Sequence, residues 1–185
     1  MDKIDSLDKI NAFVSDIRSL RKGYLTNFFL DRKKHSLWIE KGELFYVSFP
    51  DCYFLLHLTN SVNNLFFITT TSQQLAENLK AFLPIFAEQM VVDMVGDAKI
   101  VDLKDVFVEQ GFSMYEQLYR MNRIGTLEFK EIDTPNVCFA EDVDAQVVLD
   151  MLHSYFDPLS EQLPSYEEIL YFISQDRKST RLNSS

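Results

Sequence analysis

The side chains that could do chemistry in this sequence do not form a known catalytic motif. Its three histidines, His35, His57 and His153, have no second histidine or cysteine at the short spacings of zinc sites. No G-x-S-x-G, P-loop or dinucleotide-binding fingerprint occurs. Acidic pairs such as Glu167 and Glu168 fit the charged surface of a helix. We therefore interpret the histidines as buried hydrogen-bonded or surface residues, and we assign no catalytic residue.

The net charge and the cysteines of the chain indicate which partners it can bind and in which cellular compartment it lies. The 185 residues contain 18 Lys and Arg against 28 Asp and Glu, for a net charge of -10. Nucleic acid and anionic membranes repel such a chain, so we expect neither as a partner. The longest apolar runs have the length of strands and cannot cross a membrane. Cys52 and Cys138 lack C-x-x-C spacing, and Met1 opens no export signal, which predicts reduced thiols and a cytoplasmic protein.

The last ten residues, 176–185, form a segment that we exclude from fold reasoning. They read DRKSTRLNSS and resemble the translation of a common short-read sequencing adapter. We interpret them as an artefactual tail, expect them to be disordered, and expect the natural sequence to be cut off near Gln175. Without the tail's one acid and three bases, the net charge falls from -10 to -12.

Hydrophobic periodicity predicts helices and strands over residues 1–124. Apolar residues three and four apart predict an amphipathic helix from Ile4 to Leu20. Alternating residues then predict four antiparallel strands, at 36–40, 43–50, 52–59 and 65–71. Ser72 is expected to cap a helix over 73–88, which Pro84 kinks or ends. A short strand at 90–95, a helix ending near Gln110 and a strand over 112–121 complete the expected domain.

The stretch from Asp105 to Met121 carries a resemblance to a known family. It places a helix end, a glycine stop at Gly111 and an aromatic strand from Phe112 in close succession. This order resembles the closing segment of GCN5-related N-acetyltransferase (GNAT) domains, and the preceding elements follow a similar order. The resemblance implies an α/β (α+β) fold, acyl-CoA N-acyltransferase-like, with a mixed, largely antiparallel sheet flanked by helices.

Two positions depart from the family's pattern in this first domain. The family has a Q/R-x-x-G-x-G/A loop that cradles the pyrophosphate of acetyl-CoA, but Thr69–Ala76 reads TTTSQQLA, without glycine. The family often carries a proton-donating tyrosine four residues before the closing glycine, where this chain has Phe107. We therefore interpret 1–124 as a degenerate GNAT-like domain with no cofactor-binding residues.

The pattern restarts after a polar linker at 125–136. A short strand from Val137, a helix to Tyr155 and a second helix over 166–174 resemble the opening β-α-α of another GNAT domain, so 137–175 is expected to be its N-terminal fragment. The resemblance implies that the whole natural protein transfers an acetyl group from acetyl-CoA, its co-substrate, to an amine. The base is not identified, and the fragment itself is expected to be inactive.

The loop between these two helices holds the candidate substrate-binding residues. The resemblance implies that it lies over the acceptor groove, where Phe156, Asp157, Ser160 and Glu161 would meet a small-molecule or peptide amine. Helix capping by Asp157 or Ser160 is the alternative interpretation. A function of another class also stays open, namely a non-catalytic GNAT-like module that uses its sheet and aromatic strands to bind a partner or to form a homodimer.

Overall fold

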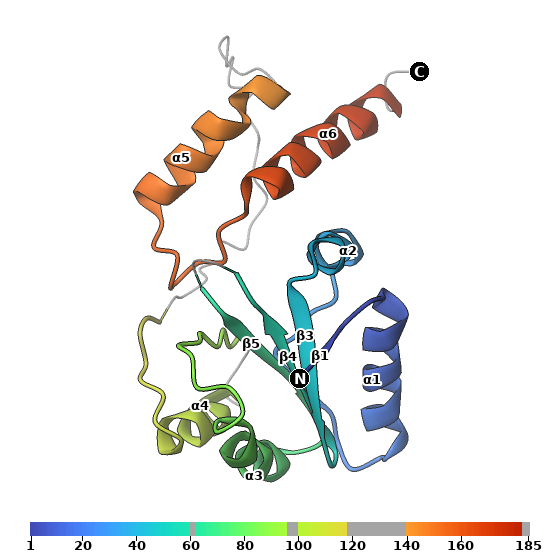
Figure 1. The fold of residues 1–185 in the computed structure, drawn as a ribbon, viewed down its shortest axis with the longest axis vertical. Helices are drawn as coiled ribbons and strands as arrows, with labels where there is room; N and C mark the ends of the chain where they lie inside the picture. The colour runs from blue at the N-terminus through green and yellow to red at the C-terminus, as the bar shows by residue number, and fades with distance from the viewer. Residues whose placement is uncertain (60–61, 96–99, 118–139, 183–185) are drawn as a thin grey trace, which may run out of the picture. The chain divides into compact units, whose positions relative to one another are not determined.

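The structure is a computed structural model that describes residues 1–59, 62–95, 100–117 and 140–182 (Figure 1). The predicted linker at 125–136, the start of the strand predicted at 137–140, and Cys138 lie outside the described residues. The chain divides into two compact units, unit 1 over Met1–Met114 and unit 2 over Tyr115–Ser185. This division falls earlier than the boundary predicted near residue 124.

Unit 1 is built on a five-stranded antiparallel sheet in the order β1-β3-β4-β5-β2. The strands are β1 Asp2–Lys3, β2 Leu25–Thr26, β3 Leu44–Phe49, β4 Cys52–His57 and β5 Asn64–Thr69. The long strands β3, β4 and β5 are neighbours in sequence and in space. Strand β3 pairs with β4 from Phe49↔Cys52 to Leu44↔His57, and β4 pairs with β5 from His57↔Asn64 to Cys52↔Thr69. The fold class is therefore mixed α and β with a largely antiparallel sheet, as predicted.

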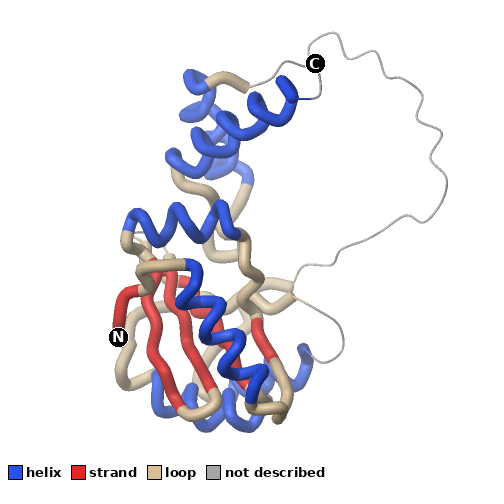
Figure 2. Tube along the Cα trace, turned by 90° about the vertical axis from the view of Figure 1, so that its right-hand side faces the viewer, coloured by secondary structure: helices blue, strands red, loops and turns tan. Residues whose placement is uncertain are grey.

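Helices cover both faces of this sheet (Figures 1 and 2). Helices α1 (Leu7–Ser19) and α2 (Arg32–Lys41) lie on one face, and α3 (Ser72–Phe82) and α4 (Ile100–Glu109) lie on the other. The strand residues alternate between two cores. The α1 and α2 side buries Leu55, Phe66 and Ile68, while the α3 and α4 side buries Phe54, Leu56, Leu65 and Phe67. Strands buried on both faces explain the continuous apolar runs of β4 and β5.

The strand predicted at 36–40 is wrong, because these residues belong to helix α2. Asp31 caps the helix, its carboxylate accepting hydrogen bonds from the amides of Lys33 (2.9 Å) and Lys34 (3.1 Å). Gly42 ends it with φ 74°. The alternation in SLWIE is too short to separate a strand from a helix, and the two caps decide the outcome. The strands predicted at 43–50, 52–59 and 65–71 are confirmed as β3, β4 and β5.

Helix α3 begins where the sequence predicts, with a different cap. The hydroxyl of Thr71, and not that of Ser72, accepts the hydrogen bond from the Gln74 amide (3.2 Å). The helix ends at Phe82, just before Pro84, so the prediction that the proline shortens it is confirmed. The strand predicted at 90–95 is reduced to one parallel bridge between Val91 and Asn64.

Helix α4 ends at Glu109, close to the end predicted near Gln110, and Gly111 follows it as the predicted glycine stop. Gly111 has φ 91° and donates to the Val108 carbonyl (3.0 Å), while Phe112 donates to the Phe107 carbonyl (3.1 Å). This pair of bonds is the Schellman ending, and the rings of Phe107 and Phe112 meet edge to face at 5.2 Å. The strand expected to follow is absent from its described part, 112–117.

Unit 2 contains a pair of helices, α5 (Ala145–Tyr155) and α6 (Tyr166–Leu182), after a short 3-10 turn at Asp142–Asp144. The two helices confirm the predicted α-α pattern. They bury Ala145, Ile169 and Ile173 between them. The expected disorder of 176–185 is wrong for its first part, because α6 continues through Leu182. Once the apolar turns of α6 are formed, each further residue adds a backbone hydrogen bond at little cost.

Candidate functional site

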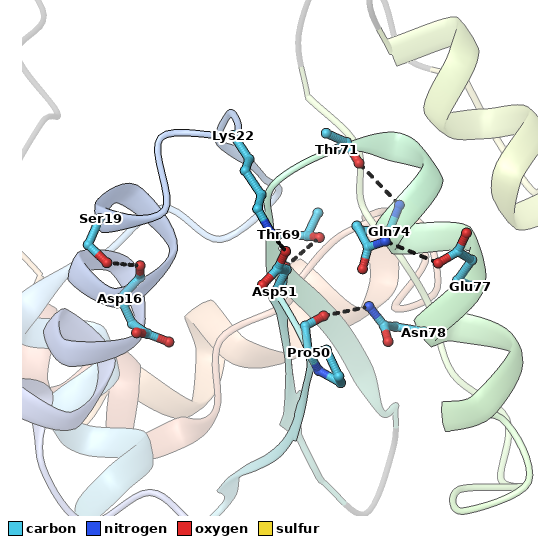
Figure 3. A network of polar contacts seen from close by, with 10 residues as sticks. All are labelled: Asp16, Ser19, Lys22, Pro50, Asp51, Thr69, Thr71, Gln74, Glu77 and Asn78. Atoms are coloured by element: carbon cyan, nitrogen blue, oxygen red, sulfur yellow. Dashed lines mark hydrogen bonds and ion pairs between the residues drawn. The ribbon is translucent and has the colours of Figure 1, made fainter.

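If the resemblance to GNAT domains holds, the loop that binds the pyrophosphate would lie at the N-terminus of α3. Here β5 ends at Thr69, Thr70 and Thr71 follow, and α3 starts at Ser72. A helix N-terminus offers unpaired amides and a partial positive charge to an anion. In this chain the Thr71 hydroxyl already takes the amide of Gln74, so the first turn is capped by its own side chain (Figure 3).

A turn of the chain packs directly against this place. Gly23 has φ 125°, and a Cβ on it would lie 2.5 Å from the Thr70 carbonyl oxygen. The segment then enters β2, which pairs with the last two residues of β5. The backbone that precedes α3 is therefore covered by the chain's own residues, and only glycine allows so close an approach.

The edge of β5 next to β2 has its backbone groups occupied. The Leu65 amide donates to the Val91 carbonyl (2.9 Å), and the Leu65 carbonyl accepts from the Asn27 side chain (3.2 Å). The Phe67 amide donates to the Asn27 carbonyl oxygen (2.7 Å), and the Phe67 carbonyl accepts from the Thr26 hydroxyl (2.6 Å). Buried Asn27 thus completes the edge between β2 and Val91, where no strand pairs.

Polar contacts beside α3 tie this region to the hairpin between β3 and β4 (Figure 3). The Lys22 ammonium lies 2.6 Å from the Asp51 carboxylate, so its charge is already paired. The Thr69 hydroxyl donates to the Asp51 carbonyl (3.1 Å), and the Asn78 side chain donates to the Pro50 carbonyl (3.0 Å). These bonds hold the positive-φ turn at Asp51 against α3.

These residues do not fit acetyl-CoA. A pyrophosphate needs open backbone amides, but the approach along β5 is filled by β2, Gly23 and Asn27, and the nearby cation is neutralised. Phe107 is 2% exposed and packs against Phe67 and Phe112, so it has a structural role and no proton to donate. Among the described residues, no group of three or more potential metal ligands occurs.

The four predicted substrate-binding residues come together in the turn after α5. Asp157 organises it: its carboxylate accepts from the Leu159 amide (2.8 Å), and its carbonyl accepts from the amides of Ser160 (3.1 Å) and Glu161 (3.0 Å). Phe156 caps the C-terminus of α5 and is half exposed. The polar groups of Asp157 and Ser160 thus serve the turn itself, and the helix cap of α6 is Ser165, whose hydroxyl accepts from the Glu168 amide (3.3 Å).

Asp157 has one further partner, which sequence reasoning missed. The Tyr115 hydroxyl donates a hydrogen bond to the Asp157 carboxylate, although 42 positions separate them. This bond lowers the pKa of Asp157, helped by the Leu159 amide, and raises the pKa of Tyr115. Both groups are exposed, so the bond marks a small polar constellation on the surface of unit 2.

A buried aromatic cluster contains two of the three histidines. His35 stacks edge to face on Trp38 at 4.8 Å, and Trp38 lies parallel to His57 at 3.7 Å. The His57 ring nitrogen lies 3.2 Å from the Glu43 carboxylate. Burial lowers the pKa of His35 to about 4, so this ring is neutral at pH 7, with its Nδ1 accepting from the Asp31 amide (3.0 Å). Of the two predicted alternatives, a buried hydrogen-bonded histidine or a surface histidine, His35 is the first, and it lies in helix α2.

The remaining predicted groups are structural. Cys52 is a free, fully buried thiol, as predicted, and its burial raises the pKa to about 12, so it is not a nucleophile. Within the described part of the chain, no helix is long and apolar enough to cross a membrane. No signal in the sequence points to Gly23, Asn27 or Tyr115, because each acts on a residue far along the chain.

No protein-family model, no curated protein and no solved structure matches this chain. Any assignment of function therefore rests on its own residues.

Proposed function

We propose that unit 1 is a degenerate GNAT-like domain that does not transfer acetyl groups, and that unit 2 contains the opening of a second GNAT domain. In this proposal the whole natural protein acetylates an amine with acetyl-CoA, and unit 1 serves it as a scaffold. Units 1 and 2 are inactive by themselves.

The order of elements in unit 1 supports this proposal. Because residues 32–41 are helical, unit 1 opens with β1, α1, the two-residue strand β2 and α2. Apart from β2, this is the β-α-α order that the resemblance gives for the opening of a GNAT domain. Three antiparallel strands, the helix α3, the bridge at Val91 and the helix α4 follow. Gly111 then ends α4 in the left-handed conformation that the resemblance requires.

The occupied edge of β5 is the observation that carries the claim of inactivity. Asn27, Thr26 and Val91 satisfy backbone groups that an extended ligand would need, and Gly23 lies against Thr70 at the start of α3. Displacing these contacts would expose buried donors and acceptors, each of which costs about 1 to 3 kcal/mol when left unpaired. A cofactor would have to compensate for several of them.

One observation favours a residual anion site. Among the described residues, the Thr70 hydroxyl is the buried side-chain polar atom without a hydrogen-bond partner, and it directly precedes the cap of α3. A phosphate oxygen would satisfy it. The close contact of Gly23 with the Thr70 carbonyl weighs against that occupant, because it fills the adjoining space with backbone.

Calorimetric titration and a thiol-release assay test the proposal. We expect no heat of binding for acetyl-CoA, and no thiol release with a panel of amines. Turnover that is lost in Thr70→Val, and kept in the control Ser19→Ala on the exposed end of α1, would contradict the proposal. The uninterrupted reading frame tests the second half: a strand followed by Q/R-x-x-G-x-G/A downstream of Gln175 supports it.

The rival interpretation, a binding module that uses its sheet, meets an obstacle in unit 1. Three aromatic side chains of β4 and β5, Phe54, Phe66 and Phe67, are at most 5% exposed beneath the flanking helices. Tyr46 and Tyr53 are partly buried and pack against Phe13 of α1. A partner of unit 1 would therefore bind mainly helices or loops.

A further inference from the structure

Helix α5 and the turn before it carry a row of exposed apolar side chains. Val143, Val147, Met151 and Tyr155 follow one another at intervals of four residues and are 81%, 60%, 55% and 79% exposed. Residues four apart lie on the same face of a helix, so these side chains form a continuous strip, here called the α5 stripe. Another part of α5, which includes Ala145, packs on α6.

The width of the apolar arc on α5 is unusual for a helix with one neighbour. Besides the α5 stripe, the helix places Val148, Leu149 and Leu152 against α6, so most of its circumference is apolar. An ordinary surface helix has one apolar stripe and an opposite charged face. In α5, a single helix cannot cover the whole arc, and the part left over is the α5 stripe.

Acidic residues predominate in this helix pair. Residues 140–182 contain nine Asp and Glu residues and three bases, Arg177, Lys178 and Arg181, which all belong to the C-terminal part of α6. Asp150 lies within α5 itself, and Glu141, Asp142 and Asp144 lie at its start. An apolar strip with acidic side chains close by has a complement of definite chemistry, namely an apolar strip bordered by bases.

We propose that the α5 stripe docks a basic amphipathic helix of another protein. The apolar face of that helix covers Val147, Met151 and Tyr155, and its Lys and Arg side chains lie toward the carboxylates of unit 2. A helix suits the stripe because side-chain ridges at four-residue spacing pack into the grooves of a second helix. This inference competes with the second half of the acetyltransferase proposal, because the rest of a second GNAT domain would also pack against α5.

Charge favours this occupant over a second copy of the chain. Two α5 stripes in contact would bring together two sets of carboxylates, because α5 and the turn before it carry four acidic residues and neither Lys nor Arg. Like charges across an interface oppose association. An anionic membrane is disfavoured for the same reason.

Isothermal titration of the full chain with model peptides tests the proposal. The probe is a helical peptide of about 18 residues, built from Leu and Lys with Leu at three- and four-residue steps. One control peptide has the same composition in scrambled order, and another has Glu in place of Lys. At physiological salt we expect the probe to bind at least about tenfold more tightly than either control, which requires about 1.4 kcal/mol.

Matched variants locate the surface. The double variant Val147→Ser, Met151→Ser should weaken binding of the probe about tenfold or more. The control Phe29→Ser changes a side chain of unit 1 that is 65% exposed, and it should leave binding unchanged. Circular dichroism of each variant confirms that it is folded.

Several outcomes would overturn the proposal. Equal affinity for the scrambled peptide would reduce the effect to charge attraction alone. Full affinity of the double variant would place the binding surface elsewhere. A concentration-dependent dimer in sedimentation, abolished by the double variant, would assign the stripe to a second copy of the chain.

Discussion

Units 1 and 2 bury their apolar residues in different ways. In unit 1, β4 and β5 lie between two layers of helices, and Phe54, Leu55, Phe67 and Ile68 are fully buried. In unit 2, α5 and α6 meet along one seam, while the α5 stripe stays exposed. Two layers give a sheet two cores, whereas two helices give each other only one contact line.

A comparison of α1 with α5 shows what amphipathic patterning establishes. Both helices have apolar residues at three- and four-residue steps. The pattern of α1 places Ile10, Phe13 and Ile17 on the sheet, where they are at most 7% exposed. In α5 a similar pattern leaves Val147 and Met151 in solvent. Hydrophobic periodicity therefore identifies the apolar face of a helix. Whether that face is buried depends on a second element that packs against it.

The largest expected difference between the units is in hydrogen exchange. Amides of β4 and β5 should open with free energies at least about 3 kcal/mol above those of α5 and α6, which is roughly a hundredfold slower exchange. The reason is that a segment of about 40 residues with one contact line seldom stabilises itself. Equal protection in α5 and β4 would mean that the units share one core.

Removing a central side chain should affect unit 1 alone. Phe54 is fully buried and stacks on Phe82 at 4.6 Å, so Phe54→Ala should lower the free energy of unfolding by about 3 to 5 kcal/mol. Urea denaturation measures this loss, and exchange in α5 should not change. The control Phe29→Ala, at an exposed position, should cost about 0.5 kcal/mol or less.

Substitutions at two glycines distinguish destabilisation by steric overlap from destabilisation by an unfavourable backbone conformation. Gly23→Ala should destabilise unit 1 by about 3 kcal/mol, because a Cβ would meet the Thr70 carbonyl at 2.5 Å and the φ of 125° is also unfavourable. Gly111→Ala should cost only about 1 kcal/mol, since nothing lies within 4 Å of its Cβ position. Equal losses in denaturant would show that the segment at Gly23 can move away from α3.

A pH dependence of the stability of unit 1 is also expected. The pKa of His35 is about 4 in the folded chain, against 6.5 for an unburied histidine, so the unfolded state binds the proton more tightly. The contribution of His35 to the free energy of unfolding is fully present above pH 6.5 and is lost as the pH decreases toward 4. Between pH 7 and 5 the loss is about 2 kcal/mol. His35→Gln should flatten this slope in denaturation curves, and an unchanged slope would exclude His35 as the cause.

The parts of the fold that local pattern determines could be predicted. Strands β3 to β5 follow from apolar runs separated by Pro50-Asp51, and the end of α4 follows from Gly111. The pattern predicts a strand in place of helix α2 because five residues fit both periods, although Asp31 and Gly42 could have indicated the helix ends. The short strands β1 and β2 exist only through pairing with β3 and β5, which no local pattern contains.

For the candidate sites, too, the sequence predicts local features and misses the contacts between residues that are far apart in the chain. The turn at Asp157, Ser160 and Glu161 lies in a polar stretch between two helical patterns, so it could be found, while its bond from Tyr115 spans 42 positions. The lack of glycine in Thr69–Ala76 is visible in the sequence, but the closing of the β5 edge by Asn27 depends on contacts across about 40 residues.

The parallel contact of Trp38 with His57 makes unit 1 optically distinct. Trp38 is the one tryptophan in the sequence, it is 2% exposed, and its ring lies 3.7 Å from an imidazole at an angle of 9°. A dry environment shifts the emission of an indole to the blue. The intrinsic fluorescence of the folded chain should therefore be blue-shifted, and it should shift to the red when the sheet of unit 1 separates from α2. Since α5 and α6 contain no tryptophan, this signal follows unit 1 without a label.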